Sequence, residues 1–154
     1  MEKDDFLFSY MKEEDIPGVY LVNTLSLKSP WSIEAFKDEF KNTFAHYIVC
    51  KYKEDIIAFA GMWIIADEAH ITNVAVHPNF RHMKIGTSLI KTLKGICSDN
   101  KVTGITLEVR ESNIIAQNLY KKEEFVNAGV RKNFYTNPVE DGIIMWCYES
   151  TDTR

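Results

Sequence analysis

The order of the elements predicts an α/β (α+β) domain in which helices cover both faces of a mixed, mostly antiparallel sheet. Strand-like segments stand near both ends of the chain, and two amphipathic helical segments flank an alternating strand between them. No repeat, low-complexity tract or linker divides the 154 residues, which are 45% apolar and 26% charged. We therefore expect one domain that spans residues 1–154.

The first half of the chain combines turn signals with hydrophobic spacing of both the helical and the strand kind. Pro17 after three acidic residues is typical of a first helical turn, and Ser32 is a good N-cap for the amphipathic residues that follow. We expect a strand beginning at 6–8, helices at 13–27 and 32–42, hairpin strands at 45–52 and 56–65 around a turn at 53–55, and a strand at 69–76.

The second half alternates more clearly between helical and strand spacing of its hydrophobic residues. Ile85, Leu89 and Leu93 recur at helical spacing, whereas Ile105, Leu107 and Val109 alternate with polar residues as in a strand. We expect helices at 85–99 and 113–122 and strands at 105–110, 125–135 and 143–148.

Composition excludes several classes of function. A formal charge of -4 argues against a general nucleic-acid binder and suits a cationic substrate such as an amine. The longest apolar run, 56–66, is much shorter than the roughly 20 residues that span a bilayer. The first five residues show no secretory signal, so we expect a cytoplasmic protein that does not bind membranes. The oligomeric state stays open.

Cysteine and histidine usage bears on redox and metal chemistry. Cys50, Cys97 and Cys147 are odd in number and lie in apolar patterns, which predicts reduced core thiols, with a catalytic cysteine as the alternative. The four histidines show no metal-ligand spacing, so we predict no metal site; they are His46, His70, His77 and His82.

The segment 71–87 has the character of a phosphate site. An apolar strand leads through a proline-marked loop into a basic turn, and an amphipathic helix begins there. Such a turn points unpaired backbone N–H groups and the positive end of the helix dipole at one place, where an anion can bind. The alternative is a solvated basic turn.

This turn resembles the pyrophosphate loop of the GNAT superfamily of N-acetyltransferases, which reads Arg or Gln, two residues, Gly, one residue, then Gly or Ala. Here Arg81 and Gly86 match, but Lys84 stands in place of the first glycine and would be strained in a left-handed conformation. The segment 107–113, with Ala116 and Tyr120 beyond it, is similar to the RimI type, bacterial enzymes that acetylate the N-terminal alanine of a ribosomal protein. A second departure is 123–125, Glu-Glu-Phe where those enzymes have Leu-Gly-Phe.

The resemblance implies a sheet whose two central parallel strands splay apart to admit acetyl-CoA. It also implies that the cosubstrate contacts Asn113, the strand edge at 74–76 and the turn at 81–87. The expected cofactor-binding residues are Val74, Ala75, Val76, Arg81, His82, Met83, Lys84, Ile85, Gly86, Thr87 and Asn113.

Two side chains are candidates for proton transfer. An amine must lose a proton before it attacks a thioester, and Glu108, on the polar face of its strand, is the candidate base. Tyr120 is the candidate acid for the departing thiolate, and it shares a helix face with Asn113. The structural alternatives are a solvated carboxylate, a core tyrosine and a helix N-cap.

The expected function is acetyl transfer from acetyl-CoA to a protein N-terminus, with the ribosomal alanine as the expected acceptor. A peptide acceptor needs a groove, for which the loop 135–142 and the segment around Trp31 are the candidate walls. Two alternatives are an acetyltransferase of the same fold that acts on a small amine or lysine, and an acyl-CoA-binding module without turnover.

Overall fold

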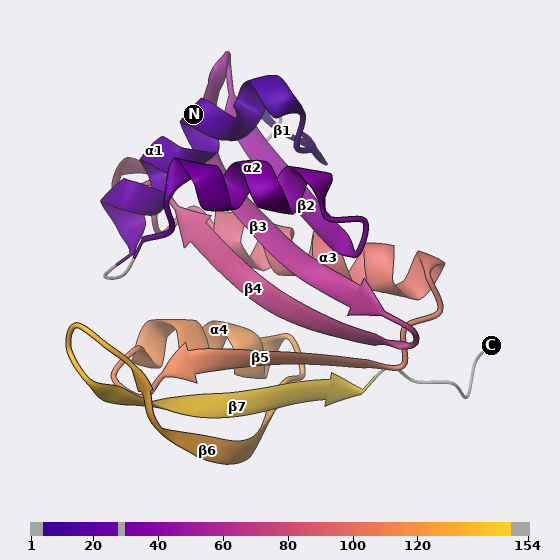
Figure 1. Ribbon diagram of the computed structural model, residues 1–154, viewed down its shortest axis with the longest axis vertical. Helices are drawn as coiled ribbons and strands as arrows, with labels where there is room; N and C mark the ends of the chain where they lie inside the picture. The colour runs from indigo at the N-terminus through magenta and orange to yellow at the C-terminus, as the bar shows by residue number, and fades with distance from the viewer. Residues whose placement is uncertain (1–4, 28–29, 149–154) are drawn as a thin grey trace.

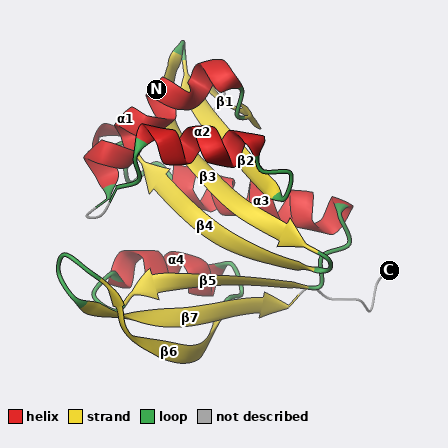
Figure 2. Cartoon of the chain, viewed as in Figure 1, coloured by secondary structure: helices red, strands yellow, loops and turns green. Residues whose placement is uncertain are grey.

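The computed structural model describes residues 5–27 and 30–148. Of the first five residues, on which the expectation of no secretory signal rests, all but the fifth lie outside the described residues. A seven-stranded sheet has the order β1-β2-β3-β4-β5-β7-β6, and β4 and β5 are its one parallel pair among the described residues (Figures 1 and 2). The strands are β1 (Phe6–Tyr10), β2 (Ala45–Tyr52), β3 (Asp55–Ile65), β4 (Glu68–Val76), β5 (Gly104–Arg110), β6 (Val126–Tyr135) and β7 (Glu140–Tyr148). The mixed, mostly antiparallel sheet that the sequence predicts is confirmed.

Helices cover both faces of this sheet. A 3₁₀ turn (η2, Glu13–Asp15) leads into α1 (Ile16–Ser26), and α2 (Ile33–Lys41) starts at Ser32, whose side chain accepts a hydrogen bond from the N–H of Ala35 at 3.1 Å. These two helices lie on one face of the upper strands, and α3 (Ile85–Asp99) lies on the other (Figure 1). A fourth helix, α4 (Ile114–Lys122), packs behind β5 and β7 (Figure 1).

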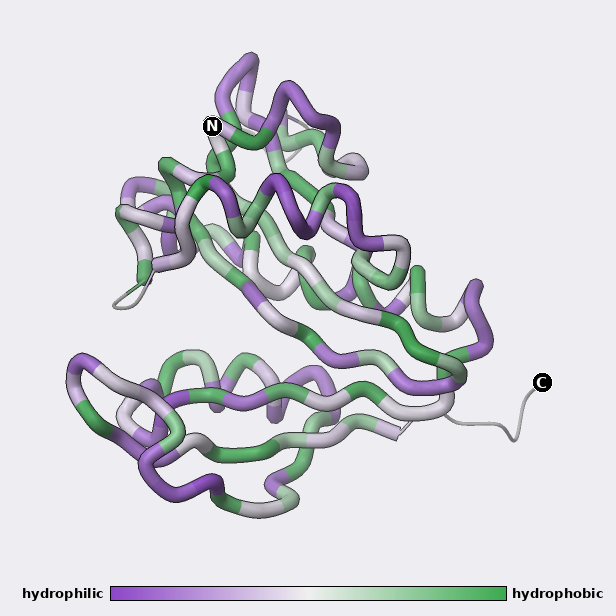
Figure 3. The backbone as a smooth tube through the Cα atoms, in the orientation of Figure 1, coloured by the Kyte–Doolittle hydropathy of each residue, from purple (hydrophilic) through white to green (hydrophobic). Residues whose placement is uncertain are grey.

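Two hydrophobic clusters hold these layers together. The larger cluster packs α3 and α4 against the sheet through fully buried Leu89, Leu93 and Leu107, and the smaller packs α1 and α2 through Val19 and Phe36. Hydrophobic residues run through the central strands, whereas α2 is mainly hydrophilic on its outward side (Figure 3). None of the described helices is long and apolar enough to cross a membrane.

Two boundaries differ from the sequence-based expectation by more than one residue. The helix expected from 13 begins as a separate 3₁₀ turn, and β7 begins at Glu140 rather than 143. The residues between β6 and β7 are therefore a tight turn at 136–139 and not a loop that reaches Gly142. Tyr135 pairs with Glu140 across the hairpin, because ladder hydrogen bonds satisfy backbone groups that a loop would leave to water.

Candidate active site

The central parallel strands separate near the middle of the sheet. β4 and β5 pair only between Glu68–His70 and Gly104–Thr106, and the strands diverge beyond that point (Figure 1). The rest of β4 pairs with β3 alone. The splayed parallel pair implied by the family resemblance is therefore present.

The expected acyl-arm segment lies on this diverging part of β4. Val74 and Val76 turn their side chains toward the larger cluster and Ala75 lies in the smaller one, so backbone groups are what the strand edge offers to a ligand. One of these groups is already engaged, since the Ser26 hydroxyl donates to the carbonyl of Val76 at 3.0 Å. An extended amide-containing ligand can pair with the remaining edge groups as an added strand would.

The turn that precedes α3 has the backbone geometry of an anion site. Lys84 is the N-cap at φ 61° and ψ 23°, in the left-handed region, and its side chain makes no capping bond. The first backbone bond of the helix is from Ser88 N–H to Lys84 O at 3.1 Å, so the N–H groups of 85–87 have no helical acceptor. These donors and the dipole of a 15-residue helix favour phosphate at this position.

The side chains of the turn divide into two groups. Arg81, His82 and Lys84 are exposed, whereas the Ile85 side chain is buried and Met83 packs against the core. Ile85 therefore offers a ligand only its backbone N–H. A Cβ on Gly86 would lie 3.2 Å from Cδ2 of Leu119, so glycine here lets α3 approach α4 closely.

Glu108 is covered rather than solvated. Its side chain is 11% exposed, Oε1 lies 2.8 Å from Nε2 of His70, and Oε2 lies 3.3 Å from Nε of Arg131. The hydrogen bond from His70 is the main cause that lowers the pKa of Glu108, while burial acts in the opposite direction. A carboxylate with a lowered pKa is ionised at neutral pH but is a weaker proton acceptor.

His70 is the residue that sequence reasoning missed. We considered the histidines only as metal ligands, and nothing in the sequence shows that residue 70 contacts residue 108. In the structure His70 occupies the last paired position of β4, opposite Thr106. Its ring stands edge-on to Trp63 at 6.4 Å, and the Trp63 indole N–H donates to Oε2 of Glu39 at 2.7 Å.

Tyr120 lies within the core at the opposite end of α4 from Asn113. It is 7% exposed, and its ring packs against Phe125 at 5.8 Å. Burial and the neighbouring Tyr135 phenol both raise the pKa of Tyr120, so its hydroxyl stays protonated. Burial, together with the charge of Glu108, raises the pKa of Tyr135 to about 12, which identifies a second phenol at this end of the site.

Asn113 is the N-cap of α4, because Oδ1 accepts a hydrogen bond from the N–H of Ala116 at 3.1 Å. The capping interaction uses only the oxygen and leaves the two amide protons as donors. The structural alternative is thus realised, and it is compatible with a cofactor contact through Nδ2.

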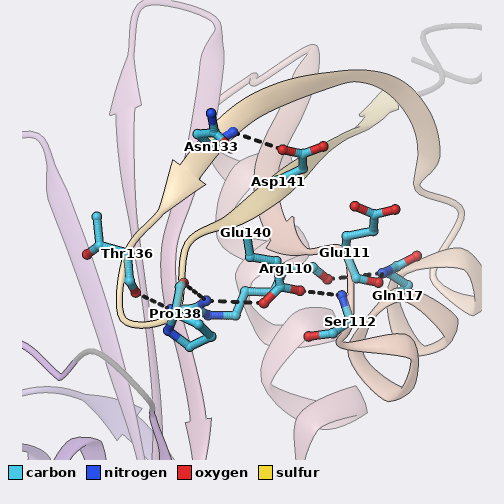
Figure 4. A network of polar contacts seen from close by, with 9 residues as sticks. All are labelled: Arg110, Glu111, Ser112, Gln117, Asn133, Thr136, Pro138, Glu140 and Asp141. Atoms are coloured by element: carbon cyan, nitrogen blue, oxygen red, sulfur yellow. Dashed lines mark hydrogen bonds and ion pairs between the residues drawn. The ribbon is translucent and has the colours of Figure 1, made fainter.

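Arg110 ties the β6–β7 turn to the end of β5. One guanidinium nitrogen donates to the carbonyl of Pro138 at 3.1 Å and lies 3.2 Å from Oε2 of Glu140, and the other donates to the carbonyl of Thr136 at 3.0 Å (Figure 4). The guanidinium also lies 4.5 Å from the centre of the Tyr135 ring. This network sets the position of the turn that we considered as a groove wall.

A shallow, wide-open groove of about 380 Å³ lies on the α2 side of the sheet. Its lining residues are Trp31, Ala35, Asp38 and Glu39. Trp31 precedes α2 and packs against Phe36 at 5.6 Å. Glu39 accepts a hydrogen bond from the Trp63 indole, whose ring contacts the ring of His70, so side-chain contacts link the groove lining to His70.

The three cysteines are buried thiols, as the sequence predicts. Burial raises the pKa of the Cys50 thiol to about 12, which disfavours the nucleophilic thiolate. Within 5–27 and 30–148, no group of three or more His, Cys, Asp or Glu side chains is arranged to hold a metal ion.

Comparisons with known proteins agree with this architecture. Residues 11–125, well over half of the chain, match the model of the acetyltransferase (GNAT) family. A Bacillus subtilis relative is 39% identical over 137 residues, which cover 88% of this chain and 91% of the relative. This relative is provisionally named a ribosomal protein bS18-alanine N-acetyltransferase.

Two solved structures share the fold. The ribosomal-protein-S18-alanine N-acetyltransferase of Escherichia coli has a TM-score of 0.88 at 27% identity, over 97% of this chain and 98% of that one. A GNAT family acetyltransferase from Elizabethkingia anophelis, solved with acetyl-CoA bound, has a TM-score of 0.80 at 21% identity, over 96% of this chain and all of that one. The splayed sheet agrees with this fold, and the family model over 11–125 together with the 39% identical relative shows that the chain belongs to the acetyltransferase (GNAT) family.

Proposed function

We propose that this protein transfers an acetyl group from acetyl-CoA to the N-terminal α-amino group of a protein, and that the acceptor is the N-terminal alanine of ribosomal protein bS18. The similarity to the Bacillus subtilis relative over most of both chains carries this proposal. With a ribosomal acceptor, we expect the reaction to take place in the cytoplasm.

The residues on the cosubstrate side suit this chemistry. The N–H groups of 85–87 and the exposed side chains of Arg81 and Lys84 would hold the phosphates, and the edge at 74–76 would pair with the amides of the pantetheine arm. Acetyl-CoA supplies an activated acetyl thioester when it is bound. Amide protons of Asn113 add a donor at the start of α4.

We expect proton transfer to take place where β4 and β5 separate. Glu108 and its hydrogen-bonded partner His70 offer the proton acceptor for the amine, and the protonated phenol of Tyr120 is the candidate donor to the thiolate. An acyl-CoA binder without turnover needs neither function, so these side chains favour the enzyme over the binding module.

Two separate features are the candidate walls for the acceptor. The groove near Trp31 carries Asp38 and Glu39, whose carboxylates attract a cationic chain end, and Arg110 positions the turn at 136–139.

The test is a thiol-release assay with acetyl-CoA and a panel of acceptors. The panel contains peptides that begin with alanine, the same peptides with a blocked N-terminus, lysine-containing peptides and small amines. We expect turnover with free N-terminal alanine and none with the blocked peptide. Preference for a small amine or lysine would redirect the proposal to that acceptor, and acetyl-CoA binding without any turnover would support the binding module.

A further inference from the structure

We propose that His70 removes the proton from the acceptor amine, and that Glu108 is the positioning residue that orients the imidazole and stabilises its charged form. This inference rests on the proposed acetyl transfer, and it divides between two side chains the role that the sequence assigns to Glu108 alone.

Position and exposure favour the histidine. His70 is the last residue of β4 that pairs with β5, so its ring stands where the two strands begin to separate. The His70 side chain is 38% exposed, whereas that of Glu108 is 11% exposed beneath it. An incoming amine can therefore reach the imidazole more easily than the carboxylate.

The hydrogen bonds determine which ring nitrogen is free. An ionised carboxylate only accepts, so Nε2 of His70 must carry the proton in its 2.8 Å contact with Oε1 of Glu108. In the neutral ring, Nδ1 then keeps its lone pair, and no hydrogen bond to Nδ1 is found among residues 5–27 and 30–148. Nδ1 is thus available as a proton acceptor.

Glu108 is a poor base but a good partner for an imidazolium. Each of its oxygens already has a partner: Oε1 is hydrogen-bonded to His70, and Oε2 forms an ion pair with Arg131 of β6. These donors hold its pKa below the usual range. The same negative charge stabilises His70 when it becomes charged, as the carboxylate does in a catalytic triad.

The proposed step balances as follows. The ammonium proton of the acceptor moves to Nδ1 of His70, and the free amine nitrogen forms a bond to the acetyl carbon. The carbon–sulfur bond breaks and its electron pair leaves with sulfur, while the nitrogen releases its second proton to solvent as the amide forms. The thiolate takes a proton from solvent, or from Tyr120, which then regains one from solvent. His70 then returns its proton to water.

The test compares His70→Gln, Glu108→Gln and the double variant. Glutamine at 70 can still donate a hydrogen bond to Glu108 but cannot accept the amine proton. We expect His70→Gln to lower kcat/KM roughly 100-fold or more, with the double variant little worse, because residues that act as a unit are not additive. His46→Gln on β2, whose ring lies beside Tyr10, is the matched control and should keep full turnover.

The pH dependence gives a second measure. If His70 takes the amine proton, the limb of the wild-type pH–rate profile that reports loss of the base should be absent from His70→Gln. Charged or titratable groups around the ring are Glu108 from β5, Arg131 from β6 through Glu108, Tyr135 near Glu108, and Glu39 from α2 through Trp63. A His70→Gln variant that keeps turnover within about tenfold while Glu108→Gln loses it would overturn the assignment and make Glu108 the base.

Nitrogen NMR of labelled histidine separates this inference from the proposed function. The His70 signals are the ones that disappear in His70→Gln. They should show the neutral ring as the Nε2–H tautomer, and an Nδ1–H tautomer would refute the proposal whether or not the protein has acetyltransferase activity. If the wild type binds acetyl-CoA but releases no thiol with any amine, the proposed function fails and so does the base assignment. Imidazole in the buffer should partly restore turnover to His70→Ala, and no recovery in a folded variant would count against the histidine.

Discussion

Lys84→Gly should stabilise the protein and weaken its hold on coenzyme A. Lys84 has φ 61°, and Glu124, which follows α4, has φ 75°. A left-handed conformation costs a residue other than glycine roughly 1–2 kcal/mol, and glycine gives back about 0.4–1 kcal/mol through the freer unfolded chain. Each glycine substitution should therefore add about 0.5–1 kcal/mol to the free energy of unfolding, a rise in Tm of roughly 1–4 °C.

Glu124→Gly is the matched control, because it relieves the same backbone conformation away from the phosphate turn. Lys84 is exposed, and Glu124 makes a 3.8 Å contact with Lys94 while 84% exposed, so neither loses a strong interaction. Only Lys84→Gly removes a cation beside the phosphates, which should raise the Kd for coenzyme A about 2- to 5-fold at low salt and less at high salt.

Denaturant unfolding and calorimetric titration of both variants measure these two effects separately. No gain in stability for either variant would refute the reasoning about backbone conformation. Tighter coenzyme A binding by Lys84→Gly would show that the freedom of glycine matters more at this position than the charge of lysine.

Three further outcomes are expected. Saturating acetyl-CoA should raise Tm by roughly 5–10 °C, since a ligand at 100 times its Kd contributes about 2.7 kcal/mol, and an unchanged Tm at millimolar ligand would remove the cosubstrate site. Tyr120→Phe should lower turnover about 10- to 1,000-fold with Tm and cosubstrate Kd near wild type, whereas unchanged turnover would leave Tyr120 as a core residue. Arg110→Met should lower kcat/KM for a peptide roughly 10- to 100-fold, mainly by raising KM, because the turn at 136–139 loses the hydrogen bonds that hold it. The control Lys132→Met, at the exposed Lys132–Asp141 pair, should have little effect. Equal losses in both variants would contradict a specific role for Arg110.

Local rules explain why so much of the fold can be predicted. Ser32 caps α2, Asn113 caps α4, and the apolar spacing of α3 matches its buried face, since each of these features depends on residues within a few positions of one another. The sequence indicated that a left-handed conformation would be strained at Lys84, and the structure shows that Lys84 adopts it. The early start of β7 escaped prediction because it depends on pairing with Tyr135.

The sequence by itself determined the order of strands and helices and nominated the basic turn at 81–87, Glu108 and Tyr120 as candidate site residues, because motif and periodicity depend on residues close together in the chain. Only the tertiary structure decided what those candidates contact. His70 and Glu108 are 38 residues apart, and they meet because β4 and β5 run parallel for three residue pairs and then separate. Burial and donors from distant strands determine how readily a carboxylate accepts a proton, so the identity of the base depends on packing that no local pattern encodes.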